Sequence, residues 1–235
     1  MAFLPSGPLT LKGGCFCSAI RYEICIPALS ERPLVPGALP TSIPPASSIT
    51  YQPAPSSDAA AEATTTVPNR LPTIEYDHCH SCRRACGSLL QVWIIFELKW
   101  VTFKLVPRDE KLGSVGHINS REQQDKMVRY ETQDIVKPSK ELQAETYIGL
   151  YSSDGEAQRT FCTRCGTPVA YHFSGDRGPD WNLGPLIDIA MGTLGKAVDM
   201  IQIPQITDAY QIKRASTWKV YDLISMGGGM TARVG

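Results

Sequence analysis

Apolar and polar residues alternate along several short stretches of the chain, which is the pattern of strands with one buried face. Residues 10–26 predict a hairpin, because residues 19–24 alternate and a Gly-Cys-x-Cys turn precedes them. Residues 88–106 are rich in apolar and β-branched side chains, and they predict two strands around a turn near residues 97–99. A short helix can begin near Arg83.

Three further strand signals lie in the second half of the chain. Residues 158–173 predict a strand, a tight Cys-x-x-Cys-Gly turn and a second strand. Residues 185–195 predict a strand and a turn, and residues 206–223 predict one more short strand. The pattern therefore predicts a mainly β protein with short strands and large loops.

Two long stretches depart from this pattern. Residues 27–72 are rich in Pro, Ala, Ser and Thr and hold few large apolar side chains, so they predict an irregular insertion. Residues 107–145 are polar and charged, with a weak periodic signal for a short helix. The length of 235 residues fits one domain, residues 1–235, that contains both insertions.

The charge balance and the absence of long apolar runs narrow the choice of partners. Lys and Arg together number 23, as do Asp and Glu, so no general field attracts nucleic acid or an anionic membrane. The first residues lack the charged start and apolar run of a signal peptide, and no run is long enough to cross a bilayer. We expect a cytoplasmic protein whose partner is a small molecule. Nothing in the sequence indicates an oligomeric state.

The cysteines carry the strongest chemical signal. There are eight, and six of them fall in close pairs, a spacing that favours metal ligands over disulfides in a cytosolic chain. The pairs are Cys15 with Cys17, Cys79 with Cys82, and Cys162 with Cys165, while Cys25 and Cys86 stand alone.

The first and third pairs suit a closed tetrahedral zinc site. A Cys-x-x-Cys turn followed by Gly166 aims two sulfurs inward, and a Cys-x-Cys pair projects both sulfurs to one side of an extended chain. We therefore expect a structural zinc ion held by Cys15, Cys17, Cys162 and Cys165. The alternative is a set of free cysteines or a disulfide.

The segment from Asp77 to Cys82 is dense in possible metal donors. Cys79 and Cys82 form a second Cys-x-x-Cys pair, and Asp77 lies two residues before Cys79, so these two side chains can face the same way. His78 and His80 alternate to the other face, and each is another candidate for the third ligand. Three protein ligands with an open fourth position is the usual arrangement of a catalytic zinc. The alternative interpretation is a redox dithiol or an ordinary loop.

In their order and composition, these motifs resemble the glutathione-dependent formaldehyde-activating enzyme family, which also contains centromere protein V. The first family motif is similar to residues 14–17, followed by residues 19–22. The second, a Cys-x-Cys-x-x-Cys-Arg run, is similar to residues 77–83, and the third is similar to residues 159–168. A weaker likeness follows at residues 192–194.

The resemblance implies a mainly β, Mss4-like (β-tent) fold with two zinc sites. It assigns the structural zinc to the cysteines of the first and third motifs, and it places Cys79 and Cys82 at the catalytic zinc. The implied activity is that of a carbon–sulfur lyase acting on a thiol adduct, as in the addition of glutathione to formaldehyde. The substrate sulfur or an oxygen would approach the second zinc as its open ligand.

The sequence departs from the family pattern at Asp77, where the family has cysteine. Asp77 is expected to join Cys79 and Cys82 as a harder oxygen ligand, which predicts a stronger Lewis acid and weaker dependence on glutathione. His80 is a candidate general base, and Arg83 is a candidate for holding a substrate anion. Alternative functions are a family enzyme with changed chemistry, such as decarboxylation, isomerisation or hydrolysis, or a non-catalytic zinc-stabilised binding module.

Overall fold

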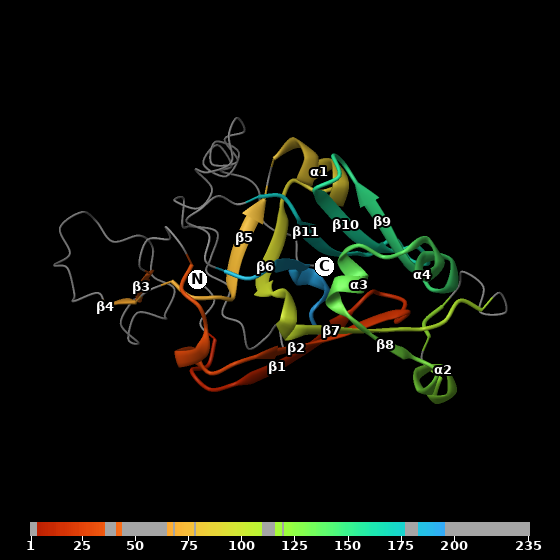
Figure 1. Ribbon diagram of the computed structural model, residues 1–235, viewed down its shortest axis with the longest axis horizontal. Coiled ribbons are helices and arrows are strands. Elements are labelled where there is room, and N and C mark those ends of the chain that lie inside the picture. The colour runs from red at the N-terminus through yellow and green to blue at the C-terminus, as the bar shows by residue number, and fades with distance from the viewer. Residues whose placement is uncertain are drawn as a thin grey trace, which may run out of the picture.

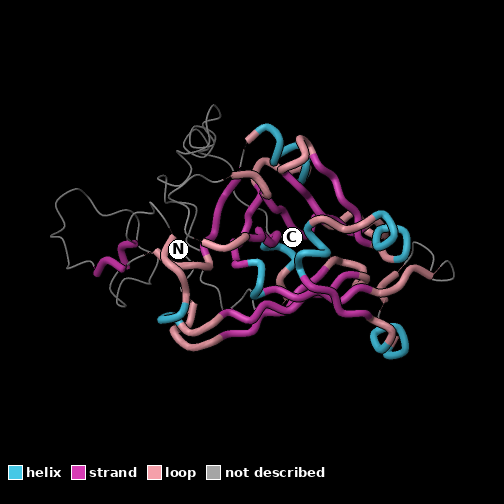
Figure 2. The backbone as a smooth tube through the Cα atoms, viewed as in Figure 1, coloured by secondary structure: helices cyan, strands magenta, loops and turns pink. Residues whose placement is uncertain are grey.

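The structure, a computed structural model, confirms the mainly β prediction. Two antiparallel sheets form the body of the molecule, and Figure 1 shows the four-stranded sheet along the lower side with the six-stranded sheet above it. Strands dominate the trace in Figure 2, and the helices are short segments at its margins and between the sheets. The structure describes residues 4–35, 41–43, 65–67, 69–77, 79–109, 116–118, 120–176 and 183–195.

The four-stranded sheet has the order β1-β2-β7-β8. Its strands are β1 (Leu9–Gly14), β2 (Ile20–Ile26), β7 (Val101–Leu105) and β8 (Val128–Glu131). The first two form the predicted hairpin, with Leu11 opposite Ile24. Burial alternates along β2 because successive side chains of a strand point to opposite faces, and Ile20, Tyr22 and Ile24 face the interior.

The six-stranded sheet has the order β5-β6-β12-β11-β10-β9. Its strands are β5 (Thr73–Asp77), β6 (Gln91–Glu97), β9 (Ile148–Ser152), β10 (Ala157–Cys162), β11 (Pro168–Phe173) and β12 (Leu186–Ala190). The predicted strand–turn–strand unit at residues 158–173 is the β10–β11 hairpin. The predicted strand and turn at residues 185–195 are β12 and the 3-10 turn η5 (Met191–Thr193).

A short 3-10 turn, η3 (Leu98–Trp100), carries the chain from one sheet to the other. Residues 88–106 contain the two strands that the sequence predicts, but β6 belongs to the six-stranded sheet and β7 to the four-stranded sheet. Leu98 and Trp100 are buried at this corner, and the Leu98 amide donates to the Pro185 carbonyl at 2.8 Å. This one stretch of chain therefore supplies a strand to each sheet.

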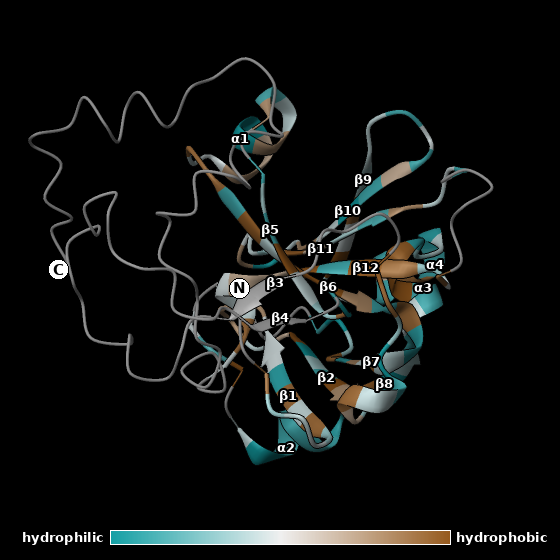
Figure 3. Cartoon of the chain, turned by 90° about the vertical axis from the view of Figure 1, so that its left-hand side faces the viewer, coloured by the Kyte–Doolittle hydropathy of each residue, from teal (hydrophilic) through white to brown (hydrophobic). Residues whose placement is uncertain are grey.

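The core lies between the sheets. Its largest fully buried side chains include Phe96 of β6 and Phe103 of β7, one from each sheet. Figure 3 shows hydrophobic colouring where β12, β6 and the short helix α3 (Thr132–Val136) approach each other. The Thr132 hydroxyl donates to the Val101 carbonyl, which fixes α3 against β7.

The stretch at residues 107–145 contributes to this core, although its polar composition gave only a weak helical signal. It contains α2 (Arg121–Asp125), strand β8, α3 and α4 (Lys140–Glu145). Ile135 and Val136 of α3 and Leu142 of α4 are buried, so few but well-spaced apolar residues anchor short helices here.

Both ends of the Pro-rich stretch at residues 27–72 pack against the core. A 3-10 turn, η1 (Leu29–Glu31), precedes Arg32, whose guanidinium is buried and donates to backbone carbonyls of Pro27, Pro5 and Gly7. Leu71, at the other end, is buried. Between them the structure describes two paired strands, β3 (Thr41–Ile43) and β4 (Thr65–Val67). The remainder of the stretch and the strand predicted at residues 206–223 lie outside the described residues.

None of the helices in the described part of the chain has the length and apolarity needed to cross a bilayer.

Candidate functional site

The structure brings together four cysteines from the two ends of the described chain. Cys15 and Cys17 lie in the turn between β1 and β2, whereas Cys162 ends β10 and Cys165 follows in the next turn. The Sγ atoms of Cys15 and Cys17 are 3.6 Å apart, those of Cys17 and Cys162 are 3.7 Å apart, and all four lie within 4.8 Å of one another. Sulfurs bonded to a tetrahedral ion at about 2.3 Å stand about 3.8 Å apart, so the cluster can hold a metal ion.

Backbone hydrogen bonds shape both turns for this purpose. The Gly166 amide donates to the Cys162 carbonyl at 2.8 Å, and Gly166 has a φ of 74°, which confirms that the turn needs a residue that tolerates positive φ. In the first turn the Cys15 amide donates to the Ile20 carbonyl at 3.0 Å, and the Ile20 amide donates to the Cys15 sulfur at 3.2 Å. The turns hold the sulfurs in place without help from a disulfide, since all eight cysteines are free.

Electrostatics also favours a cation in the cluster. A hydrogen bond from the Cys162 thiol lowers the pKa of Cys15 to about 5, and the same contact raises the pKa of Cys162. Burial raises the pKa of Cys17. The thiolate of Cys15 is thus favoured while those of Cys17 and Cys162 are disfavoured, and a divalent cation would allow all four sulfurs to be thiolates.

A second group of donors lies at the start of α1 (His80–Cys86). Asp77 ends β5, and Cys79 is the N-cap residue of α1, where its sulfur accepts from the Cys82 amide at 3.3 Å. The Sγ atoms of Cys79 and Cys82 are 3.0 Å apart, and the Cys82 Sγ is 3.5 Å from Asp77 Oδ2. The structure therefore brings together the three residues that the sequence singles out, which we call the Asp77 trio.

The Asp77 trio is looser than the four-cysteine cluster. Within the described residues, that cluster is the one group of three or more His, Cys, Asp or Glu side chains whose donor atoms all lie within 4.8 Å of one another. Burial, the neighbouring Cys79 and the Asp77 carboxylate raise the pKa of Cys82 to about 12. Without a cation the Cys82 side chain is therefore a thiol, and a metal ion at the trio would be needed to hold it as a thiolate.

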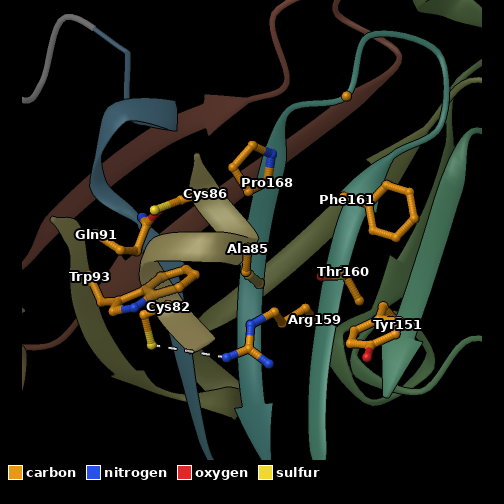
Figure 4. Close-up of a pocket in the computed structure, with 12 residues that line it drawn as sticks. Cys82, Ala85, Cys86, Gln91, Trp93, Tyr151, Arg159, Thr160, Phe161 and Pro168 are labelled. Atoms are coloured by element: carbon orange, nitrogen blue, oxygen red, sulfur yellow. Dashed lines mark hydrogen bonds between the residues drawn. The ribbon is translucent and has the colours of Figure 1, made fainter. Parts of the chain in front are cut away.

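A pocket of about 340 Å³ opens beside the trio, between α1 and strands β9 to β11 (Figure 4). Cys82 belongs to the trio and also lines the pocket, so the two features share a wall. The residues that line the pocket are Cys82, Ala85, Cys86, Gln91, Trp93, Tyr151, Arg159, Thr160, Phe161, Gly166, Pro168 and Ala170.

Arg159 is the charged residue of this site that sequence reasoning missed. Its Nη2 atom lies 4.0 Å from the Cys82 Sγ, as the dashed line in Figure 4 marks, and its guanidinium lies over the Tyr171 ring at 5.0 Å from the centroid. A signal was present in the strand pattern before Cys162. In β10, Thr160 and Cys162 are buried whereas Arg159 and Phe161 are partly exposed, so the latter two belong to the other face.

The other predicted site residues lie on α1 but not in the pocket. His80 begins α1 and is exposed, and Arg83 is partly buried one turn later. Neither is among the described residues that line the pocket, whereas Cys86, which the sequence left without a role, does line it. His78 lies outside the described residues.

No protein-family model matches the chain, and no curated protein matches it. The likeness to formaldehyde-activating enzymes therefore rests on the cysteine motifs and their order. The geometry adds that the first and third motifs meet in space, and that the second motif meets a pocket.

Proposed function

We propose that the protein is a zinc-dependent enzyme of the carbon–sulfur lyase type, acting on a thiol adduct or a related small organic molecule. The observation that carries the proposal is the position of Cys82, which contacts Asp77 and Cys79 on one side and lines a pocket on the other. A metal ion at the trio would face a space large enough for a small substrate.

The four-cysteine cluster is the proposed structural zinc site. Four thiolates close the coordination shell of zinc, so such a site has no open position for a substrate. The cluster joins the turn of the β1–β2 hairpin to the end of β10, and metal binding there would contribute directly to folding.

The Asp77 trio is the proposed catalytic site. Zinc held there by one carboxylate and two thiolates would polarise a substrate carbonyl or acidify a bound thiol or water. The chain itself contributes the Arg159 cation, 4.0 Å from Cys82, which can stabilise negative charge on a substrate near the trio. Similarity to the family's second motif supports the assignment of Cys79 and Cys82.

A second candidate function is a redox dithiol at Cys79 and Cys82. Their sulfurs are 3.0 Å apart, which is closer than the roughly 3.8 Å expected for two thiolates on one zinc ion. The position of Cys79 at the N-cap of α1 is also one at which thiols become reactive.

Metal analysis and turnover measurements on the same sample separate these functions. Protein purified without chelators should contain two zinc ions per chain and should convert a thiol adduct, with glutathione and formaldehyde as the first pair tested. The variant Cys82→Ser should lose one zinc and the turnover. The control Cys25→Ser changes an exposed thiol on β2 and should behave as the parent protein.

Two results would decide against the lyase proposal. One zinc per chain, combined with a Cys79–Cys82 disulfide that forms and reduces reversibly, would favour the redox dithiol. Two zinc ions with turnover of a carbonyl compound that needs no thiol would favour changed chemistry within the same site.

A further inference from the structure

Among the described residues that line the pocket beside the Asp77 trio, one carries a permanent charge. Of its lining residues, Arg159 alone carries a side chain that is always ionised, and most of the others are apolar or aromatic. A cation that lines an otherwise apolar pocket fixes the orientation of a ligand that carries an anionic group.

The surroundings of Arg159 leave its charge available to a ligand. Its guanidinium lies over the Tyr171 ring, with Cζ 5.0 Å from the centroid, and none of the salt bridges among the described residues includes it. Asp154 contributes an attraction from the exposed β9–β10 turn, but within the described structure the two side chains form no salt bridge. A planar guanidinium presents paired donors that match the two oxygens of a carboxylate.

Aromatic side chains stand on both sides of this cation. In Figure 4 Trp93 lies beside Cys82, whereas Phe161 and Tyr151 lie on the other side of Arg159. Trp93 is also in contact with Tyr171, with ring centroids 6.2 Å apart, so the aromatic wall continues beneath the guanidinium. Aromatic side chains in these positions favour a ligand with a flat apolar ring system, because aromatic pairs contribute stabilisation beyond that of apolar burial alone.

The volume limits the ligand further. About 340 Å³ is near the lower end of the range for small-molecule sites, roughly 300–1,000 Å³, and suits a molecule of one or two rings rather than a peptide.

We infer that this pocket binds a small aromatic carboxylate, with the carboxylate on Arg159 and the ring system between Trp93 and Phe161. The carboxylate would then lie next to Cys82, since Arg159 Nη2 is 4.0 Å from the Cys82 sulfur. The inference deepens the proposed function by naming a substrate class for the same site, but binding itself does not require the second zinc.

The test is calorimetric titration of the full chain with three probes. 2-Naphthoate carries the ring system and the charge, 2-naphthalenemethanol carries the rings alone, and acetate carries the charge alone. We expect saturable binding of 2-naphthoate and binding at least about tenfold weaker for each of the other two. The variant Arg159→Gln should weaken 2-naphthoate binding about 10- to 100-fold, because it removes a charged hydrogen-bond donor.

A matched control is an arginine on α1, the helix that borders the pocket. Arg84 is exposed on α1 and does not line the pocket, so Arg84→Gln removes the same charge nearby and should leave binding unchanged. The variant Arg159→Lys keeps the charge but not the paired donors, and it should bind with intermediate affinity.

Zinc content measured on the same samples separates this inference from the proposed function. A protein with one zinc that still binds 2-naphthoate through Arg159 keeps the inference and rejects the second zinc. If Arg159→Gln loses a zinc ion as well as 2-naphthoate binding, the role of Arg159 is to position the Asp77 trio rather than to bind the ligand. The inference would then be overturned. Equal binding of 2-naphthoate and 2-naphthalenemethanol, or no binding of either, would also overturn it.

Discussion

The Sγ atom of Cys17 lies 3.7 Å from the Sγ atom of Cys162, although the two residues are 145 positions apart in the sequence. Cys17 belongs to the hairpin turn of the four-stranded sheet, and Cys162 ends a strand of the six-stranded sheet. A metal ion on this cluster would therefore tie the two sheets together. Removing the ion would break the link that closes the loop of chain between Cys17 and Cys162.

The variant Cys162→Ser tests this role. Its side chain is fully buried, so the substitution should both weaken metal binding and leave a hydroxyl in the cluster. Structural zinc contributes on the order of 10 kcal/mol to small domains, so we expect an insoluble or largely unfolded chain with one zinc fewer. Circular dichroism and metal analysis provide the measurement, with Cys25→Ser as the control. A folded, zinc-free variant with an unchanged melting curve would rule out a structural metal.

Substitutions of Asp77 test the second site independently of the first. Its carboxylate lies 3.5 Å from the Cys82 sulfur, so Asp77→Ala should remove one ligand and lower the zinc content by one ion while the fold is kept. Asp77→Cys restores a three-sulfur site and should retain two ions and depend more strongly on a thiol substrate. Metal analysis and initial rates at varied glutathione concentration measure both effects. Unchanged metal content in Asp77→Ala would show that the carboxylate only closes the turn.

Gly13 marks a close approach between β1 and the turn that follows β12. Gly13 of β1 pairs with Leu194 after η5, and an added Cβ would lie 2.5 Å from the Thr193 carbonyl oxygen and would also clash with the Tyr22 ring. The variant Gly13→Ala should therefore lose about 1–3 kcal/mol of unfolding free energy, measured by urea denaturation. The matched control Gly192→Ala, which has open space around the new Cβ, should change stability by less than about 0.5 kcal/mol.

Arg32 provides a test of how the Pro-rich stretch is attached. Its buried guanidinium donates to Pro27, Pro5 and Gly7 carbonyls at 2.7–3.0 Å. Arg32→Met should leave these carbonyls without donors and cost about 2–4 kcal/mol in unfolding free energy. Arg84→Met, on an exposed part of α1, is the control and should be nearly neutral. Equal stability of the two variants would mean that this end of the stretch contributes little.

The local elements could be predicted because each leaves a short-range signal. The alternation at residues 19–24 and the Cys-x-x-Cys-Gly turn before Pro168 depend on residues a few positions apart, and both appear in the structure, the first as part of β2. The partners within the four-cysteine cluster could also be proposed, because two-residue and three-residue spacings orient sulfurs in a known way.

Contacts between residues far apart in the sequence could not be predicted in the same way. The local patterns predict β6 and β7 as strands, but they do not assign the two strands to different sheets, which only packing decides. Arg159 likewise looks like an ordinary charged residue on a strand until β11 brings Tyr171, and α1 brings Cys82, to its side. Helices α3 and α4 are short, and their few apolar residues give little periodic signal.

The late position of β12 in the sequence affects how the chain folds during its synthesis. It fills the gap between β6 and β11 near the middle of the six-stranded sheet, yet it lies at residues 186–190, after both of its neighbours. At roughly 5–20 residues per second, a ribosome needs roughly 5–19 seconds to pass from the end of β6 to the end of β12. Throughout that interval β6 lacks one neighbour, and β11, which is complete only from residue 173, lacks one for roughly the last 1–3 seconds, so each presents an open hydrogen-bonding edge to other chains. A nascent chain arrested before Leu186 should therefore bind chaperones and aggregate on release, whereas one arrested with β12 outside the exit tunnel should do neither.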